Sequence, residues 1–523
     1  MSIRELKPTV LWNHFADLNE VPRPSKKEEK VIAFAKTFGE GLGLVTYVDA
    51  AGNVIIKKPA TPGMESKKTV VLQSHLDMVH QKNSDTEFDF ATEGIRSYVD
   101  GEWVTAEGTT LGADNGIGVA SIMALLSSTE IPHPPVEALF TIDEETGMTG
   151  AFELEQGILE GKILLNLDTE DDDEFSIGCA GGIDTNTLFT YKPIPVDNNE
   201  CAFFLTVRGL KGGHSGMDIH LERGNANKIM NRLMDALLPE GIKIAEIDGG
   251  SLRNAIPRES FAKVVLPSGQ LDVDANIADI KNEFAITEPD LEIRIEPCEL
   301  PKNTMTYENS VQVVRAIGST HNGVYRMSSA IPGLVETSSS LARVIVSDGE
   351  FKTQSLQRSS VDSSKLDVSH TVGAPYHLIG AEVEHTGSYP GWAPNPKSEI
   401  LDIMEPLYKE LYNEDPRVQA CHAGLECGIL NERYPGLDMI SFGPTIRNPH
   451  SPDEKVHIAS VEKFWGLLLE VLKRIPNAKS TKDSVGEELT LEDVDSLKGE
   501  INTGAQSTGK TVDLSSLKKR DSL

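Results

Sequence analysis

Five short motifs along the chain contain the residue types that a two-metal hydrolase needs. They are centred, in chain order, on His75-Leu76-Asp77, Asp114, Glu144-Glu145, Asp168 and His450. Imidazole and carboxylate groups at the ends of separate strands can converge on two zinc-like ions, with one carboxylate bridging them. One further glutamate would then be free to move a proton. The pattern predicts a reaction centre, not only a metal site.

His75 and Asp77 lie two positions apart at the end of an apolar run. Because positions i and i+2 of a strand face the same side, Asp77 can accept a hydrogen bond from the imidazole nitrogen that does not bind metal. This contact would fix the ring and raise its basicity. Taken alone, the same spacing also fits a histidine that caps a strand and an acid in the following turn.

Glu144 and Glu145 follow the apolar run 138–142, so they are expected just after a strand end. Neighbouring side chains there can point in different directions, one towards a metal and one towards a bound water. A metal lowers the pKa of its water towards neutrality, so a nearby carboxylate suffices as the base. Paired glutamates are also common on solvated surfaces, and the preceding strand is what favours a catalytic role.

An acidic run, Glu170 to Glu174, follows Asp168 and could suggest a calcium loop. The EF-hand pattern requires glycine at the sixth loop position, which counted from Asp168 is Asp173. We therefore predict a solvated loop here.

The first part of the chain alternates helical and strand-like patterns. Helical spacing covers 6–18, 27–41 and 116–127, a hairpin is expected over Val45 to Lys57, and buried strands over 69–73, 136–142 and 162–167. Three of the strands lead directly into His75, Glu144 and Asp168, and the third helix follows Asp114. The pattern predicts an α/β domain with a mixed sheet flanked by helices and the site at strand ends.

The pattern changes from about Cys201. Strand-like runs cover 202–207, 262–266, 291–295, 342–346 and 352–357, with an amphipathic helix over 225–238. We place an inserted α+β domain at 186–390, which ends near Tyr389-Pro390-Gly391-Trp392. If His450 completes the metal site, the catalytic domain consists of two segments, 1–185 and 391–476.

The last segment, 477–523, contains no aromatic residue and is rich in polar and charged residues. Such a segment cannot bury enough apolar surface to offset its conformational entropy, so we predict a disordered tail. A short helix is possible over 490–497.

Bulk composition excludes some partners. A length of 523 residues favours two or more domains, and 49 basic against 80 acidic side chains give a formal charge of −31. This charge repels nucleic acid and anionic membranes. No apolar run approaches the ~20 residues that span a bilayer, and the start lacks a signal-peptide core. We expect a cytoplasmic protein whose five scattered cysteines are reduced and mostly buried.

Longer motifs surround these positions and are more specific than any single residue. They are His75-Leu76-Asp77-Met78-Val79, Gly112-Ala113-Asp114-Asn115-Gly116, Glu144-Glu145-Thr146-Gly147, Gly209-Leu210-Lys211-Gly212-Gly213-His214-Ser215-Gly216, His422-Ala423-Gly424-Leu425-Glu426-Cys427-Gly428 and His450-Ser451-Pro452-Asp453-Glu454. The ordered series resembles the zinc metallopeptidase family that includes aminoacylases, carnosinases and glutamate carboxypeptidases, and within it the bacterial aminoacyl-histidine dipeptidases. The resemblance extends from near residue 8 to about residue 476.

The resemblance implies a role for each matched position in the first domain. His75 and Asp168 would hold one zinc ion, Glu145 and His450 the other, and Asp114 would bridge the two. Asp77 would orient His75. Glu144 would be the general base that activates the water and then protonates the leaving amine.

The resemblance also makes the inserted domain a lid that binds substrate. His214 would stabilise the oxyanion, in this family often across a dimer, while Asn254 and Arg358 would bind the substrate carbonyl and its C-terminal carboxylate. Gly424 would line the pocket. These roles agree with the chemistry of the groups, since Arg binds a carboxylate bidentately and a developing oxyanion needs a donor.

The expected activity is metal-dependent hydrolysis of unblocked dipeptides, with Xaa-His substrates of the carnosine type favoured. An N-acyl-amino-acid deacylase on the same scaffold and a non-catalytic metal-binding scaffold protein are the alternatives, and the intact Glu144 argues against the latter. Two Zn²⁺ ions per chain are expected, although Mn²⁺ or Co²⁺ can occupy such ligand sets. The resemblance further implies a homodimer that acts on a small peptide substrate.

Overall fold

The computed structural model describes residues 2–267, 273–329, 331–395 and 397–478. Met1–Pro476 forms one compact unit. The predicted tail, with the possible helix over 490–497, lies outside the described residues from 479 onwards.

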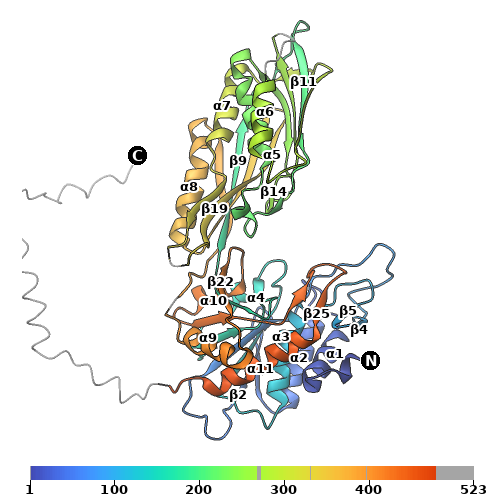
Figure 1. The fold of residues 1–523 in the computed structure, drawn as a ribbon, viewed down its shortest axis with the longest axis vertical. Helices are drawn as coiled ribbons and strands as arrows, with labels where there is room; N and C mark the ends of the chain where they lie inside the picture. The colour runs from blue at the N-terminus through green and yellow to red at the C-terminus, as the bar shows by residue number, and fades with distance from the viewer. Residues whose placement is uncertain (1, 268–272, 330, 396, 479–523) are drawn as a thin grey trace, which may run out of the picture. The chain divides into compact units, whose positions relative to one another are not determined.

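The first sheet has eight strands in the order β1-β2-β6-β3-β7-β23-β8-β22. It lies in the lower part of the ribbon, which contains the labels β2 and β22 (Figure 1). The bounds of the strands are β1 (Val45–Val48), β2 (Val54–Lys58), β3 (Val70–His75), β6 (Val136–Thr141), β7 (Ile163–Asn166), β8 (Glu174–Cys179), β22 (Arg417–Cys421) and β23 (Asp438–Ser441). β1 and β2 form the hairpin predicted from the sequence. The sheet combines parallel and antiparallel pairs, which confirms the predicted mixed sheet.

Three parallel central strands bring the predicted site residues to one edge of this sheet. β3 pairs in parallel with β6 and β7, and all residues of the three strands are buried. His75 ends β3 level with Thr141, while Asn166 ends β7 level with Gln73. Asp168 therefore follows one strand and Glu144 another at the edge where His75 lies.

Helices flank the first sheet, which is why its central strands are buried on both faces. They are α1 (Thr9–Asn19), α2 (Glu29–Gly41), α3 (Ala113–Ser127), α4 (Thr149–Glu153), α9 (Glu399–Tyr412), α10 (Glu426–Arg433) and α11 (Ile458–Arg474). α3 contains the predicted helix, but Asp114 and Asn115 have non-helical dihedral angles at its start. The side chain of Asp114 thus leaves the chain just before the regular helix.

A small four-stranded sheet supports His450. Its order is β24 (Ile446–Arg447), β25 (Lys455–His457), β5 (Trp103–Ala106) and β4 (Ser97–Asp100). β24 and β25 pair antiparallel, so His450 lies in the loop that connects them, with a left-handed φ of 60°.

The second large sheet is formed by residues 181–389. Its main order is β16-β11-β15-β13-β19-β20-β9-β21, with β18 paired to β19. The strands are β9 (Gly181–Thr190), β11 (Cys201–Arg208), β13 (Lys243–Gly249), β15 (Ser260–Leu266), β16 (Glu292–Cys298), β18 (Gly323–Met327), β19 (Val335–Ser347), β20 (Glu350–Ser359) and β21 (Glu382–Tyr389). The helices of this region are α5 (Ala226–Ala236), α6 (Asp274–Glu283), α7 (Tyr307–Ser319) and α8 (Asp362–Leu378).

This sheet consists of two halves with the same topology. One half runs β11-α5-β13-β15-α6-β16, and the other is built from β9, α7, β19, β20, α8 and β21 in the same succession. In each half the strand order is fourth, first, third, second, and the two halves join where β13 pairs antiparallel with β19. A single chain therefore builds a continuous sheet from two repeated units.

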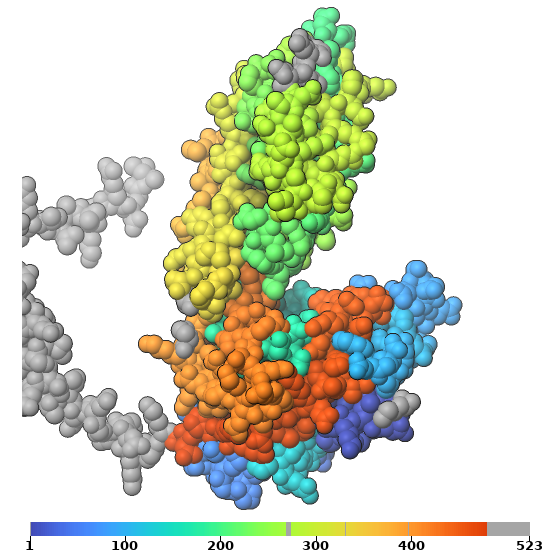
Figure 2. Space-filling model, in the orientation of Figure 1, coloured from blue at the N-terminus to red at the C-terminus, as the bar shows by residue number. Residues whose placement is uncertain are grey.

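The chain crosses between the two large sheets twice at one place. Cys179 and Trp392 exchange two backbone hydrogen bonds of 2.9 Å, beside the turn predicted as the crossing point. Residues of the two sheets occupy separate regions of the surface in Figure 2. We propose these as a two-segment catalytic domain, 1–185 and 391–476, and an inserted domain, 186–390; the second sheet already begins at Gly181.

Two simpler expectations concern cysteines and membranes. All five cysteines are free thiols, and Cys179 and Cys427 are buried while the other three are partly exposed. Within the described part of the chain, no helix combines the length and apolarity required for a membrane span.

Candidate metal centre

Four predicted ligands surround the carboxylate of Asp114. Its Oδ1 lies 3.2 Å from Nε2 of His75, and its Oδ2 lies 3.3 Å from Nε2 of His450. Nε2 of His75 is 3.4 Å from Oδ1 of Asp168, and Nε2 of His450 is 3.0 Å from Oε2 of Glu145. The two oxygens of the Asp114 carboxylate thus face two different imidazoles. Each imidazole also contacts a second carboxylate, Asp168 for His75 and Glu145 for His450.

Asp77 lies behind His75 and is fully buried. Its Oδ1 is 3.4 Å from Nδ1 of His75, and Nδ1 also lies 3.1 Å from the Asp77 carbonyl oxygen. The carboxylate further accepts hydrogen bonds from Ser25 Oγ and from the backbone N–H groups of Glu144 and Glu145. Asp77 therefore links the imidazole to the loop that contains the paired glutamates.

Charge in the cluster favours a cation at its centre. Although burial alone would lower it, Asp168, Asp114 and Asp77 raise the pKa of His75 well above its ordinary value. Hydrogen bonding to Asp114 and Glu145 raises the pKa of His450 to about 11. Burial raises the pKa of Glu144 well above its ordinary value, with only partial compensation by His75.

The donor set fits metal ions. His75, Asp114 and Glu145 each offer a ligand atom within 4.8 Å of the others. Oε1 of Glu145 and Oδ1 of Asp168 are buried with no hydrogen-bond donor. Buried carboxylate oxygens are costly without a donor or a cation, so bound ions would satisfy these two atoms. Imidazole and carboxylate ligands accept Zn²⁺, Mn²⁺ or Co²⁺.

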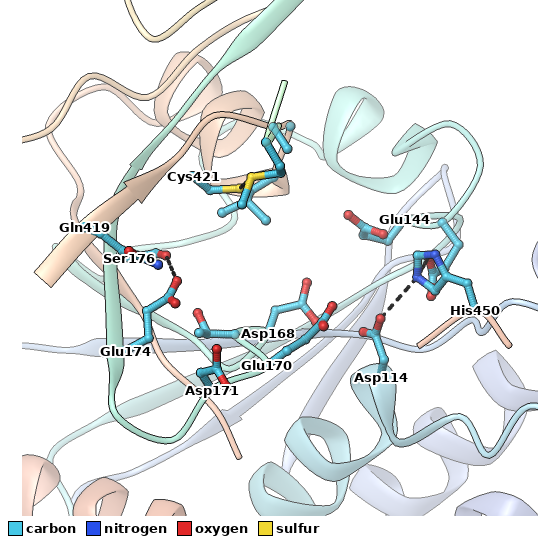
Figure 3. A pocket seen from close by; sticks show the side chains of 16 residues that line it. Asp114, Glu144, Asp168, Glu170, Asp171, Glu174, Ser176, Gln419, Cys421 and His450 are labelled. Carbon is cyan, nitrogen blue, oxygen red and sulfur yellow. Dashed lines mark hydrogen bonds and ion pairs between the residues drawn. The ribbon is translucent and has the colours of Figure 1, made fainter. Parts of the chain in front are cut away.

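A pocket of about 450 Å³ opens beside this cluster. In Figure 3 Asp114, Glu144 and His450 lie on one side, Glu174, Ser176 and Gln419 on the other, and Asp168 and Glu170 between them. The pocket is also lined by Met217, Cys421 and Gly424.

The acidic run after Asp168 is part of the pocket wall. Glu170, Asp171 and Glu174 line the pocket and are only partly exposed. Burial raises the pKa of Glu170 to about 8. The prediction of a solvated loop is therefore wrong for these residues, because the loop folds back between β7 and β8 instead of extending into solvent.

The proposed substrate residues of the inserted domain are only partly assembled. His214, in β12 (Gly213–His214), lies 3.4 Å from Nη2 of Arg358, whose Nη1 donates a 2.8 Å hydrogen bond to Tyr389. Asn254 is exposed, its backbone oxygen accepts from Ser215, and it does not line the pocket. The structure thus brings His214 and Arg358 together and leaves the Asn254 side chain apart, and none of the three is among the residues that line the pocket.

The tautomer of His214 follows from its contacts. Its Nδ1 accepts backbone hydrogen bonds from Gly216 and Met217, at 3.2 and 2.9 Å. Burial, followed by the charge of Arg358, lowers the pKa of His214 to about 4, so the ring is neutral near pH 7. The remaining proton is therefore assigned to Nε2, which faces the guanidinium. Two donors directed at the same space suit an anionic group.

A buried hydrogen-bond chain lies beneath the cluster and was not predicted. Oε2 of Glu426 accepts from Gln73 Nε2 and Thr141 Oγ1, each at 2.7 Å. Gln73 Oε1 accepts from Asn166, whose Oδ1 accepts from Ser441. Gln73 and Asn166 each lie two positions before a predicted ligand. The hydrogen bond between them therefore links the two strands that lead to His75 and Asp168.

Residues 71–474 match the Peptidase family M20/M25/M40. The chain belongs to this peptidase family. It is 42% identical to the cytosol non-specific dipeptidase of Escherichia coli over 482 residues, which cover 91% of this chain and 99% of that protein. The family resemblance inferred from the motifs is confirmed.

Solved structures agree with this assignment. The aminoacylhistidine dipeptidase from Vibrio alginolyticus is 45% identical, with a TM-score of 0.86, covering 92% of this chain and 99% of that one. The aminopeptidase PepT from Bacillus cereus, at 16% identity and a TM-score of 0.52 over 90% and 99% of the two chains, shares the fold.

Proposed function

We propose that this peptidase hydrolyses unblocked dipeptides at two metal ions bridged by Asp114, and that it favours Xaa-His substrates. The observation that carries the proposal is that the two oxygens of the Asp114 carboxylate contact different histidines, His75 and His450. His75 and Asp168 would hold one ion, and Glu145 and His450 the other. We propose zinc as the native metal, with Mn²⁺ or Co²⁺ as substitutes.

The bound ions would supply a water of lowered pKa and a polarised peptide carbonyl. Glu144 lines the pocket beside the ligands and would take the proton of the attacking water and pass it to the leaving amine. Asp77 would keep the His75 ring in place.

His214 and Arg358 would act on the substrate itself. The neutral imidazole can donate from Nε2 to the developing oxyanion, and Arg358 can bind the C-terminal carboxylate. Asn254, which is exposed, would have to approach to bind the substrate carbonyl. Gly424 would line the pocket near the scissile bond.

The acidic wall supports cationic substrates. Asp171 and Glu174, which also pair with Arg417, would favour the free ammonium group of a dipeptide and a positively charged side chain, whereas Glu170, with a pKa of about 8, is mostly protonated at pH 7. An N-acylated amino acid lacks that ammonium group, so this wall would favour a dipeptide over an N-acylated amino acid. The printed names of the Escherichia coli and Vibrio relatives support dipeptides as the substrate class.

Cytosolic location and a homodimer belong to the same proposal. The former is supported by the name of the Escherichia coli relative. The latter rests on the resemblance, and sedimentation velocity would test it. His214 needs no second subunit to meet Arg358, since one chain places them 3.4 Å apart.

The test is hydrolysis of Leu-His, β-Ala-His and N-acetyl-histidine by metal-reconstituted protein. We expect cleavage of the first two, loss of cleavage after chelation and in Glu144→Ala, and normal cleavage in Glu153→Ala, which removes an exposed carboxylate of α4. Cleavage of the acetylated substrate alone would instead assign a deacylase. No cleavage of any of them by folded, metallated protein would favour a scaffold role.

A further inference from the structure

Glu454 is a buried carboxylate that binds a backbone loop, although no chemical role follows from its place in the sequence. It is 2% exposed. Its Oε2 accepts hydrogen bonds from the N–H groups of Leu111 and Gly112 at 2.8 and 2.9 Å, and its Oε1 from Ala113 and Asp114 at 2.8 and 3.2 Å. Four consecutive N–H groups thus converge on one side chain.

Arg23 holds the same loop from another side. Its guanidinium is 1% exposed, and Nη2 donates a 2.6 Å hydrogen bond to the carbonyl oxygen of Gly112. Nη1 donates to the carbonyl oxygens of Leu76 and Asp77, each at 3.2 Å. Gly112 has a φ of 69°, and a Cβ atom there would lie 2.4 Å from Nη2 of Arg23. Only glycine permits this approach without a shift of the guanidinium.

The two contacts connect the three parts of the metal centre. Arg23 ties the loop of residues 111–114 to the chain directly after His75. Glu454 ties the same loop to the turn that begins at His450. Asp114 ends the loop, between these two attachments.

We propose that Arg23 and Glu454 are positioning residues that fix the bridging carboxylate of Asp114 between His75 and His450. The inference rests on the proposed function, which assigns the metal ligands. The contacts of Arg23 and Glu454 with residues 111–114, which we call the clamp, are present in the chain without metal. Both oxygens of Glu454 are filled by N–H donors, so this residue supports the ligands without being one of them.

The four N–H donors around Glu454 make one substitution especially informative. Glu454→Gln keeps the size of the side chain but replaces one acceptor oxygen with an NH₂ group. That group would face two backbone N–H donors, so two of the four hydrogen bonds would be lost and replaced by opposed donors. Asp453→Asn is the matched control, since it neutralises the adjacent, exposed carboxylate.

Two measurements test the clamp. In metal-free protein, amide hydrogen exchange of a peptide containing residues 111–114 should be faster in Glu454→Gln than in wild type and Asp453→Asn. In competition with a chromophoric chelator, zinc affinity should fall about 10–100-fold, as it does when groups that orient ligands are removed. The dipeptide KM should change little beside kcat, because the clamp does not touch substrate.

Folded Glu454→Gln protein with wild-type exchange and wild-type zinc affinity would overturn the proposal. If that variant does not fold, Glu454→Asp replaces it: it keeps the charge and both oxygens on a shorter side chain, and wild-type exchange and zinc affinity in it would equally overturn the clamp. Failure of the proposed function is separable, since a wild-type chain that binds no zinc would still show whether Glu454 protects the amides of 111–114.

Discussion

The proposed metal centre and the proposed substrate-binding residues of the inserted domain are built in different ways. The five proposed ligands follow buried strand ends or clamped loops, and their contacting atoms lie 3.0–3.4 Å apart. On the inserted domain, His214 and Arg358 meet each other while Asn254 stays exposed. The difference teaches that the proposed reaction centre is set by the first sheet and the small four-stranded sheet beside it, whereas the proposed substrate-binding residues lie in the second large sheet and in or next to the separate pair β12–β14 (Ala255–Ile256).

The largest expected effect is metal removal, which should abolish hydrolysis by disabling only the first of these regions. We expect chelated protein to be inactive and to regain activity with Zn²⁺, Mn²⁺ or Co²⁺, because carboxylate and imidazole ligands accept each of them. Steady-state hydrolysis of Leu-His after dialysis measures this. Full activity in protein shown by elemental analysis to be free of metal would contradict the account.

Two neighbouring substitutions separate base from ligand within the metal centre. Glu144→Gln should lower kcat roughly 10²–10⁴-fold, the range for loss of a general base, with zinc content unchanged. Glu145→Gln should instead lose zinc, because it removes a proposed ligand. Measuring kcat and bound zinc for both variants checks the assignment, and zinc loss in the first variant with zinc retained in the second would reverse the roles.

Removal of Arg358 should damage recognition while leaving the metal centre intact. Arg358→Ala would truncate one partner of the proposed buried charge pair with the substrate carboxylate, a loss of about 2–5 kcal/mol that corresponds to roughly 30-fold or more in kcat/KM. A dipeptide amide, which lacks the carboxylate, should be affected less. Arg232→Ala, on the partly exposed surface of α5, is the control. Equal losses for both substrates would remove Arg358 from carboxylate binding.

The smallest effect concerns stability beneath the metal centre. Burial raises the pKa of Glu426 to about 8 from an ordinary value of 4.5. Between these values the folded protein holds a proton that the unfolded chain releases, so this group makes the protein less stable as pH rises. Glu426→Gln removes the titration and retains an acceptor for Gln73 and Thr141. The Tm of Glu426→Gln minus the Tm of wild type should therefore increase from pH 5 to pH 8.

The matched control for that comparison is Glu432→Gln, an exposed position on the same helix. Its Tm difference from wild type should not change over the same pH range. A constant difference for Glu426→Gln as well would show that the carboxylate is ionised in the folded protein throughout.

Much of the first sheet could be predicted because buried parallel strands are continuously apolar and end abruptly. The runs 69–73, 136–142 and 162–167 match β3, β6 and β7 closely. Each leads into a titratable residue at the strand end or just beyond it, and this marked His75, Glu144 and Asp168. The repeat in the second sheet was not predicted, because it becomes apparent only from the order in which the strands pair.

The supporting residues could not be predicted because their partners are distant in sequence. Glu454 binds a loop more than 300 positions earlier, and Glu426 contacts Gln73 across a similar separation. Arg23 resembled any surface arginine before a helix. Glu170 was misread because a run of acids normally predicts solvent, and only the return of the chain into β8 turns it towards the pocket.

The most direct test of the central claim is an anomalous difference map, recorded at the zinc absorption edge from crystals of the zinc-loaded protein. The account predicts two peaks on either side of the Asp114 carboxylate, one beside His75 and Asp168 and the other beside Glu145 and His450. A single peak, or peaks that Asp114 does not bridge, would contradict it.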